Sequence, residues 1–297
     1  MTMTVGVIGL GPMGGNIARL LLERQFKVSG FDLNPDCMAA LDDTGLDAAA
    51  SVTEVAANAD VIITSLPSAG ALDAVIDGIS EHDRAGQIVI ECSTLTVDQK
   101  IAAHDRIAEG GKVFLDSPIS ATPAMLAKMM ASIHISGDEA AYQECIAVFE
   151  GFTASNFYVG PVGNGSRMKI LANYLVHVNT TAAAECMALG QKAGLDPDMI
   201  YEVLCKSAGT SKMFEIRGAM MAKSDYREGG GTMFAIYEKD SSIITEFAAQ
   251  MKSPIDLYVS SRQKMNSAMA LGLGHLDTSA VCKAIEVAAG IDRKLVE

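Results

Sequence analysis

Two polar residues, Lys169 and Asn173, lie in a long stretch rich in alanine, methionine and leucine. Lys169 could act as an acid or base, and Asn173 could form hydrogen bonds beside it. They are four positions apart, so a helix would place both side chains on one face. An ammonium can give a proton to a substrate oxygen during a reduction, and a neutral amine can take it during an oxidation. Asn173 could donate a hydrogen bond to the same oxygen or to a carboxylate. Position alone leaves the alternative that Lys169 is an ordinary solvated surface charge.

A glycine-rich segment near the beginning of the sequence matches the pattern GxGxxG, and it consists of Gly9, Leu10, Gly11, Pro12, Met13 and Gly14. It follows an apolar run over 5–9 and opens a helical pattern over 14–25, which is the context that a dinucleotide site requires. The first glycine permits a tight turn, the second lets the backbone approach a pyrophosphate, and the third lets helix and strand pack closely. The N–H groups at the beginning of the helix favour the same anion. The segment therefore predicts NAD or NADP binding.

Asp32, at the end of the second apolar run, distinguishes between these cofactors. A carboxylate there can accept hydrogen bonds from ribose hydroxyls and repels a 2′-phosphate, and no lysine or arginine occurs from Leu33 to Ala40. The sequence therefore predicts NAD. The alternative is that the glycines form an ordinary strand–helix turn and that Asp32 caps a loop.

A bound NAD⁺ would also affect Lys169. Its cationic nicotinamide, together with partial burial, would lower the pKa of Lys169 towards the range in which the amine can act as a base.

Three further residues lie at the ends of predicted strands and are expected to border the cofactor, because ligands bind at the carboxyl ends of strands in such sheets. They are Leu66, Pro67 and Thr94. Since serine, threonine and proline also favour turns, simple turn formation remains the alternative for these side chains.

The elements that must position these residues follow from the pattern of apolar runs. Between residues 5 and 136, short runs rich in β-branched residues alternate with helical patterns, which indicates βαβ units and a mainly parallel sheet. From residue 165 onwards the patterns are helical, beginning with one long helix over 165–192 that Gly194 ends. We therefore predict an α/β fold: a doubly wound Rossmann domain over 1–162, then an all-helical substrate and oligomerisation domain over 163–297, built on the long interdomain helix.

Composition excludes several function classes. The 297 residues carry a formal net charge of −13, which would repel nucleic acid. The six cysteines form no CxxC pair and the five histidines are scattered, so we expect reduced thiols and no metal site. The first residues do not resemble a secretory signal, and no run of about 18 uncharged apolar residues occurs. We therefore expect a cytoplasmic protein without a membrane partner.

Four motifs, in this order and spacing, resemble those of the 3-hydroxyacid (β-hydroxyacid) dehydrogenase family, which includes 3-hydroxyisobutyrate dehydrogenase and L-threonate dehydrogenase. The glycine-rich segment is similar to the family's GLGxMG loop. Residues 116–120 (DSPIS) resemble the beginning of its DAPVSGG substrate motif, and residues 163–173 resemble its GxGxxxKxxxN motif. Lys239 and Asp240 resemble a late KD pair. The resemblance covers nearly the whole chain, and residues 207–217 and 275–281 are most similar to the threonate branch.

The resemblance implies roles for several of these residues. Lys169 would be the acid/base, Asn173 its substrate-orienting neighbour, and Lys239 a residue by the nicotinamide end of the cofactor. Ser120 and the backbone after it would hold the substrate carboxylate, in agreement with the anion nest that successive N–H groups form. Family members are dimers or tetramers in which the helical domains pair, so a homodimer or homotetramer is implied.

The chain also departs from the family pattern around the substrate. Ala121 and Thr122 replace two glycines of the substrate motif, and Tyr174 replaces an asparagine found in many members. In the threonate-like segment, Lys212 and Phe214 are candidate substrate contacts, together with Ser211 and Arg217. Helix packing and surface charge are the alternative for this group.

The resulting prediction is an enzyme, an NAD-dependent dehydrogenase that reversibly oxidises the CH–OH group of a short hydroxy acid. A threonate-like member would oxidise C2, and a hydroxyisobutyrate-like member would oxidise a primary alcohol at C3. One alternative is an imine reductase of the same fold, which usually lacks the lysine on the long helix. Another is a catalytically silent NAD(H)-binding sensor. Lys169 argues against the imine reductase. Lys169, Asn173 and Lys239 together argue against the sensor, whereas the altered substrate loop favours it. NADH binding without turnover on any hydroxy acid would identify the sensor.

Overall fold

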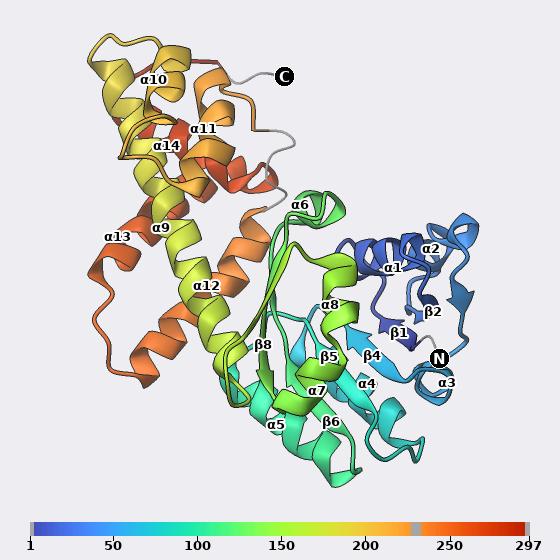
Figure 1. Ribbon diagram of the computed structural model, residues 1–297. Helices are drawn as coiled ribbons and strands as arrows, with labels where there is room; N and C mark the ends of the chain where they lie inside the picture. The colour runs from blue at the N-terminus through green and yellow to red at the C-terminus, as the bar shows by residue number, and fades with distance from the viewer. Residues whose placement is uncertain (1–2, 227–232, 295–297) are drawn as a thin grey trace. The chain divides into compact units, whose positions relative to one another are not determined.

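The computed structural model describes residues 3–226 and 233–294. The chain divides into two compact units, Met1–Lys169 and Ile170–Glu297, which we call unit 1 and unit 2 (Figure 1). Unit 1 is built on a β-sheet, whereas unit 2 is helical.

The sheet of unit 1 has nine strands in the order β3-β2-β1-β4-β5-β6-β8-β7, with β9 paired to β8. Strands β1 to β6 run parallel. Strand β8 is antiparallel to β6 and β7 and parallel to β9. The bounds are β1 (Thr4–Ile8), β2 (Lys27–Phe31), β3 (Asp47–Ala48), β4 (Val61–Thr64), β5 (Ile88–Glu91), β6 (Val113–Asp116), β7 (Ile119–Ser120), β8 (Ser132–Gly137) and β9 (Ser155–Tyr158).

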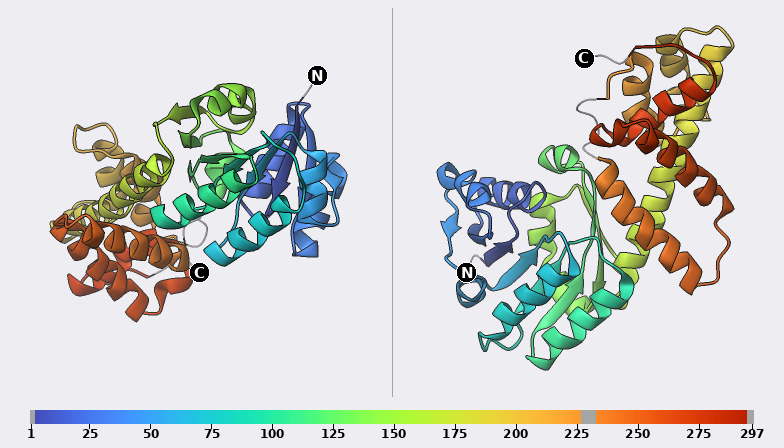
Figure 2. Two further views of the ribbon diagram at one scale, coloured as in Figure 1. Left: turned by 90° about the horizontal axis from the view of Figure 1, so that it is seen from below. Right: turned by 180° about the vertical axis from the view of Figure 1, so that it is seen from behind.

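Helices cover both faces of this sheet (Figures 1 and 2). One face packs against α1 (Gly14–Glu23), α6 (Pro123–Ala127), α7 (Glu139–Glu144) and α8 (Ile146–Phe152). The other packs against α3 (Val52–Asn58), α4 (Ala69–Ser80) and α5 (Val97–Glu109). The short helices α2 (Pro35–Ala39) and η1 (Asp42–Thr44) follow β2.

Side chains of each central strand alternate between two hydrophobic cores. In β4, Val61 and Ile63 belong to one core and Ile62 to the other. Because both faces of a parallel sheet are covered, such a strand is an uninterrupted apolar run rather than an alternating one. The predicted doubly wound fold is confirmed. Strands β3, β7 and β9 were not predicted, because the first two have only two residues and β9 lacks an apolar run.

Unit 2 consists of helices around a single core. Its first element is the continuation of α9 (Asn164–Lys192), which begins in unit 1 and ends before Gly194, a residue with φ of +85°. The core gathers Met187, Phe214, Phe234 and Tyr237 among its buried residues. The remaining elements are α10 (Pro197–Leu204), α11 (Lys212–Lys223), α12 (Phe234–Gln250), α13 (Asp256–Ala270), η2 (Leu273–His275), η3 (Thr278–Ala280) and α14 (Val281–Ala288).

The two compact units divide later along the chain than the predicted junction between residues 162 and 163. The division falls between Lys169 and Ile170 because the first turn of α9 forms hydrogen bonds with the sheet of unit 1. Within the described part of the chain, no helix combines the length and the apolar character that a membrane span needs.

Candidate active site

The glycine-rich turn between β1 and α1 has the geometry that a dinucleotide site requires. Gly9 has φ of +86°, and a β-carbon there would overlap the carbonyl oxygen of Ser65. A β-carbon at Gly14 would overlap the carbonyl oxygen of Gly9, so only glycine lets α1 pack this closely on the strand. At Gly11 a β-carbon would meet no other heavy atom within 4 Å, so the bare backbone borders open space. The turn therefore fits the pyrophosphate of a dinucleotide.

Asp32, directly after β2, is hydrogen-bonded to the turn and to its own loop. Its Oδ2 accepts from the N–H of Leu10 at 2.6 Å, and its Oδ1 accepts from the N–H of Asn34 at 2.7 Å. Carboxylate oxygens have further lone pairs, so ribose hydroxyls can still donate to them. Asp32 thus both orders the glycine-rich turn and offers acceptors beside it.

A hollow of about 330 Å³ lies along this turn and the beginning of α2. Asp36 and Cys37 line it, and the pKa of the Cys37 thiol is raised by desolvation and by the negative charges of Asp32 and Asp36. Arg19 of α1 lines the same hollow, and its guanidinium donates to the carbonyl of Ala40 at 2.7 Å. Arg19 precedes Asp32 by 13 residues, so its place in this hollow was not predicted from the residues that follow Asp32.

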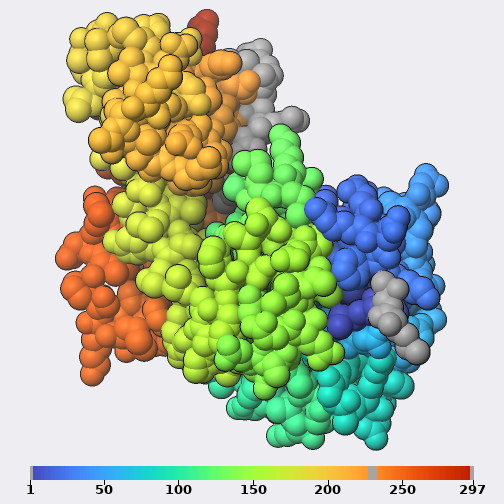
Figure 3. Space-filling model, in the orientation of Figure 1, coloured from blue at the N-terminus to red at the C-terminus, as the bar shows by residue number. Residues whose placement is uncertain are grey.

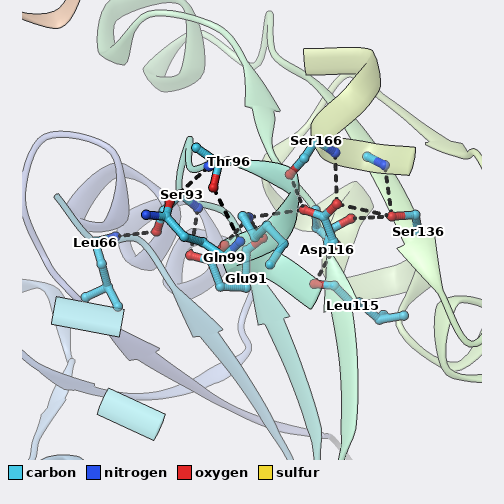
Figure 4. Close-up of polar contacts among 12 residues, drawn as sticks. Leu66, Glu91, Ser93, Thr96, Gln99, Leu115, Asp116, Ser136 and Ser166 are labelled. Carbon is cyan, nitrogen blue, oxygen red and sulfur yellow. Dashed lines mark hydrogen bonds and ion pairs between the residues drawn. The ribbon is translucent and has the colours of Figure 1, made fainter. Parts of the chain in front are cut away.

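The end of β4 adjoins the glycine-rich turn, because β4 pairs with β1, and the end of β5 lies one strand further along the sheet. The order of the strands reverses between β1 and β4, which is where such sheets bind ligands. Leu66 and Pro67 follow β4, and Thr94 follows β5. The N–H of Leu66 donates to Oγ of Ser93 at 2.8 Å, and the N–H of Ser93 donates to Oε1 of Glu91 at 2.9 Å (Figure 4). These hydrogen bonds therefore connect the end of β4 with the end of β5.

Helix α9 begins at Asn164 and carries Lys169 in its second turn. The first turn of this helix lies against the sheet. Oδ2 of Asp116 accepts from the N–H of Ser166 at 2.8 Å, and Oδ1 accepts from its hydroxyl at 2.9 Å (Figure 4). The N–H of Gly165 donates to Oγ of Ser136 at 2.9 Å. A β-carbon at Gly165 would overlap the carbonyl oxygens of Asp116 and His134. The helix therefore begins directly beside the segment that resembles the family's substrate motif.

Lys169 is buried, with 8% of its surface exposed. The pKa of the His134 imidazole is lowered, first by burial and then by the nearby charge of Lys169. Since β8 carries His134, this lysine lies close to the mixed edge of the sheet. The proximity of Lys169 to His134 could not be read from the sequence.

The predicted substrate residues of unit 1 lie in and after β7. Ser120 is half-buried and pairs with Ser132 of β8. Ala121 packs against the core. The hydroxyl of Thr122 accepts from the N–H of Met125 at 3.3 Å and thereby caps α6. Ala121 and Thr122, which depart from the family motif, thus contribute to core packing and to the cap of α6.

In unit 2, Asn173 is buried and its Nδ2 donates to Oδ2 of Asp240 at 2.8 Å. Oδ1 of Asp240 lies 3.7 Å from Nζ of Lys239. The late KD pair is therefore connected to Asn173. The sequence analysis named Lys239 but not Asp240 as a site residue, since the pairing of α9 with α12 cannot be read from the chain.

The other predicted residues of unit 2 lie on or beneath α11. Lys212 is exposed and pairs with Glu215 at 3.0 Å, whereas the ring of Phe214 is buried and stacks on Tyr201. Arg217 is buried and lies 3.5 Å from Asp277. Ser211 caps the helix by accepting from the N–H of Phe214. These contacts favour the packing alternative for Phe214 and Arg217.

Unit 1 also contains a buried ion cluster that was not predicted from the sequence. Nζ of Lys100 pairs with Glu91 and lies 3.1 Å from Asp116, and all three side chains are fully buried. One signal was available, because Lys100 shares the buried face of α5 with Val97 and Ile107. A lysine in an apolar stripe requires buried partners.

Comparison with known proteins agrees with this geometry. Residues 4–160 match the model described as the NAD binding domain of 6-phosphogluconate dehydrogenase. Residues 163–285 match the model described as NAD-binding of NADP-dependent 3-hydroxyisobutyrate dehydrogenase.

Individual relatives span nearly the whole chain. The chain is 34% identical to L-threonate dehydrogenase of Cupriavidus necator, with 95% of this chain and 96% of that protein covered. It is 30% identical to 2-(hydroxymethyl)glutarate dehydrogenase of Eubacterium barkeri, with 98% and 97% covered. The crystal structure of 3-hydroxyisobutyrate dehydrogenase from Salmonella typhimurium has a TM-score of 0.83 at 31% identity, with 95% and 99% covered. The chain therefore belongs to the 3-hydroxyacid dehydrogenase family and is an NAD-binding dehydrogenase.

Proposed function

We propose that this enzyme reversibly oxidises a short-chain hydroxy acid, with Lys169 as the general acid/base. The observation that carries the proposal is the burial of Lys169 on α9, where the helix begins beside the segment 116–120. When bound, NAD⁺ accepts a hydride, which is the carbinol hydrogen with its bonding electrons. The neutral amine of Lys169 takes the hydroxyl proton, so the products are the carbonyl acid, NADH and an ammonium. The ammonium then releases its proton to solvent.

Asn173 lies one turn after Lys169 on the same face of α9. With Nδ2 engaged by Asp240, its amide is held in one orientation. An amide has a second N–H and a carbonyl oxygen, so it can still bind the substrate or the lysine. We assign Asn173 the orientation of the substrate, and Lys239 a place by the nicotinamide end of the cofactor.

The substrate carboxylate is assigned to Ser120 and the backbone of Ala121 and Thr122. Thr122 uses its oxygen to cap α6, which leaves its hydroxyl hydrogen available to a substrate oxygen. Relatives named for L-threonate and for 2-(hydroxymethyl)glutarate both act on acids that carry a hydroxyl group. We therefore propose a small hydroxylated acid, with threonate as the first candidate and oxidation at C2. Lys212 remains a proposed contact for a further acidic group.

We propose NAD rather than NADP as the preferred cofactor. The carboxylates of Asp32 and Asp36 make the ribose side of the turn negative. Desolvation, and then the charges of these two carboxylates, raise the pKa of the nearby Cys37. A 2′-phosphate placed there would be repelled. Arg19 lies in the same hollow but already donates to Ala40. Assays with NAD⁺ and NADP⁺ side by side test this point.

We also propose that the enzyme is a cytoplasmic homodimer or homotetramer that pairs through unit 2. Leu171 and Leu175, four positions apart on α9, are each more than half exposed. With Leu189, Met199 and Val203 they add apolar area to α9 and α10, which form the yellow-green and yellow surface in Figure 3. All six cysteines are free thiols, which is consistent with a reducing compartment. Light scattering during gel filtration tests the oligomeric state.

The test of the enzymatic proposal is a substrate panel. NADH absorbance is followed with NAD⁺ and threonate, 3-hydroxyisobutyrate, glycerate, 4-hydroxybutyrate or 3-hydroxypropionate at mildly alkaline pH. We expect turnover on one acid and a loss of about 10²-fold or more in Lys169→Ala. Undiminished activity in that variant would overturn the mechanism. NADH binding without turnover on any acid would favour the silent sensor, and reduction of an imine would favour the imine reductase.

A further inference from the structure

The buried ions of unit 1 are forced together by the register of the sheet. Glu91 and Asp116 are direct partners in the pairing of β5 with β6, and both are fully buried. Two carboxylates that face each other repel, and burial makes their charge still less favourable. Lys100 of α5 lies between them and pairs with both. Burial alone would lower the pKa of Lys100, but Glu91 and then Asp116 outweigh this and raise it.

The cluster of two carboxyl groups and one lysine lies at the carboxyl ends of β5 and β6. A fully apolar replacement of such a cluster is often as stable as the ions themselves, so the cluster is weak evidence for stability alone. The hydrogen bonds from the cluster to other residues indicate which segments of the chain it positions.

On one side, the cluster holds the beginning of α9. Asp116 accepts both the N–H and the hydroxyl of Ser166, and Ser136 donates to Asp116 while accepting from Gly165 (Figure 4). A carboxylate at the N-terminus of a helix satisfies N–H groups that lack partners within the helix. Lys169 follows Ser166 by three residues, so the position of its backbone depends on this anchor.

On the other side, the cluster holds the strand ends that border the cofactor site. Glu91 accepts from the N–H of Ser93, and Oγ of Ser93 accepts from the N–H of Leu66. A continuous chain of polar contacts thus runs from Leu66 to the first turn of α9 (Figure 4).

We propose that Asp116, Lys100, Glu91 and Ser166 are positioning residues for the dehydrogenase reaction. They fix the beginning of α9 relative to the ends of β4 and β5, so that Lys169 is held in register with the bound cofactor and substrate. This inference rests on the proposed role of Lys169. It differs from that role because none of the four residues touches the reacting atoms.

The test compares Ser166→Ala and Asp116→Asn with Arg167→Ala, a control on the same turn whose exposed side chain donates to Asn164 at 3.0 Å. We expect kcat to fall about tenfold in Ser166→Ala and about 10²-fold in Asp116→Asn, because small displacements of a reacting group have effects of this size. The KM for NAD⁺ of Ser166→Ala should stay unchanged. Because the loss of a hydrogen bond to a buried carboxylate also lowers stability, kcat is measured at a temperature where the variant is fully folded. Substrate deuterated at the carbinol carbon should show a larger isotope effect on kcat, because hydride transfer becomes slower. Ser166→Thr, which keeps the hydroxyl, should recover activity.

Two results would overturn the inference. Unchanged kcat and isotope effect in Ser166→Ala, with Lys169→Ala inactive, would reject the positioning role and leave the acid/base role intact. A loss of kcat that disappears at temperatures where the variant is fully folded would make the cluster purely structural. If Lys169→Ala itself stayed active, the proposed function would fail instead. Ser166→Ala keeps the test valid if Asp116→Asn does not fold.

Discussion

The first turn of α9 is held by ionised groups of unit 1, whereas residues 177–181 of the same helix are held by neutral groups of unit 2. Asp116, part of a fully buried ion cluster, accepts from Ser166. Further along, His177 bonds the hydroxyl of Tyr258 at 2.7 Å, and Thr181 bonds Ser261 at 2.7 Å. Buried charges cost more free energy than buried hydroxyls, and they tolerate the loss of a partner less well. The costlier arrangement lies where the proposed acid/base residue must be placed accurately.

The largest expected effect comes from removing the cation of the ion cluster. Lys100→Met leaves Glu91 and Asp116 facing each other without a counter-charge, so we expect the free energy of unfolding of unit 1 to fall by about 3–5 kcal/mol. Hydrogen exchange can follow the strands of unit 1 separately from unit 2. Lys27→Met, which removes an exposed lysine from β2, is the control. Equal exchange protection in both variants would contradict the comparison.

The neutral contacts should matter less. Thr181→Val removes one hydroxyl of the Thr181–Ser261 pair, and Ser261 can still donate to the carbonyl of His177 at 3.4 Å. We therefore expect a loss of about 1 kcal/mol, measured by denaturant unfolding, with kcat unchanged. Thr245→Val serves as the control, because the hydroxyl of Thr245 donates to the carbonyls of Ser241 and Ser242 in its own helix. A loss as large as that of Lys100→Met would remove the distinction between the two regions.

The smallest expected effect is a change of stability with pH that depends on His134 of β8. Burial and then the charge of Lys169 lower the pKa of His134 below its ordinary value of 6.5. The folded state therefore binds fewer protons than the unfolded state in this range. Stability is fully present above pH 6.5 and is lost as the pH falls from there through the lower pKa of the folded state. Denaturant midpoints at several pH values should show this loss, and His134→Gln should reduce it. An identical pH dependence in the variant would contradict the assignment.

The sequence predicted those features that depend on local pattern. The glycine spacing of residues 9–14, the apolar strands and the length of α9 each follow from neighbouring residues, and the structure has them near the predicted positions. The ion cluster was missed because its members meet only through the register of β5 with β6 and the packing of α5. Asp240 was missed as a partner of Asn173 for the same reason. Arg217, a candidate substrate contact in the sequence, forms a buried ion pair with Asp277, which lies 60 positions away and could not be paired with it from local pattern.

The most direct test of the central claim is chemical rescue of Lys169→Ala. A small amine such as methylamine, added at increasing concentration, can occupy the space of the missing ammonium and exchange a proton with the substrate oxygen. We expect hydroxy acid oxidation by Lys169→Ala to rise with amine concentration. Lys169→Arg should stay inactive, because a guanidinium keeps the positive charge but does not release its proton. Full activity in Lys169→Arg, or in Lys169→Ala without amine, would contradict the assignment of Lys169 as the acid/base.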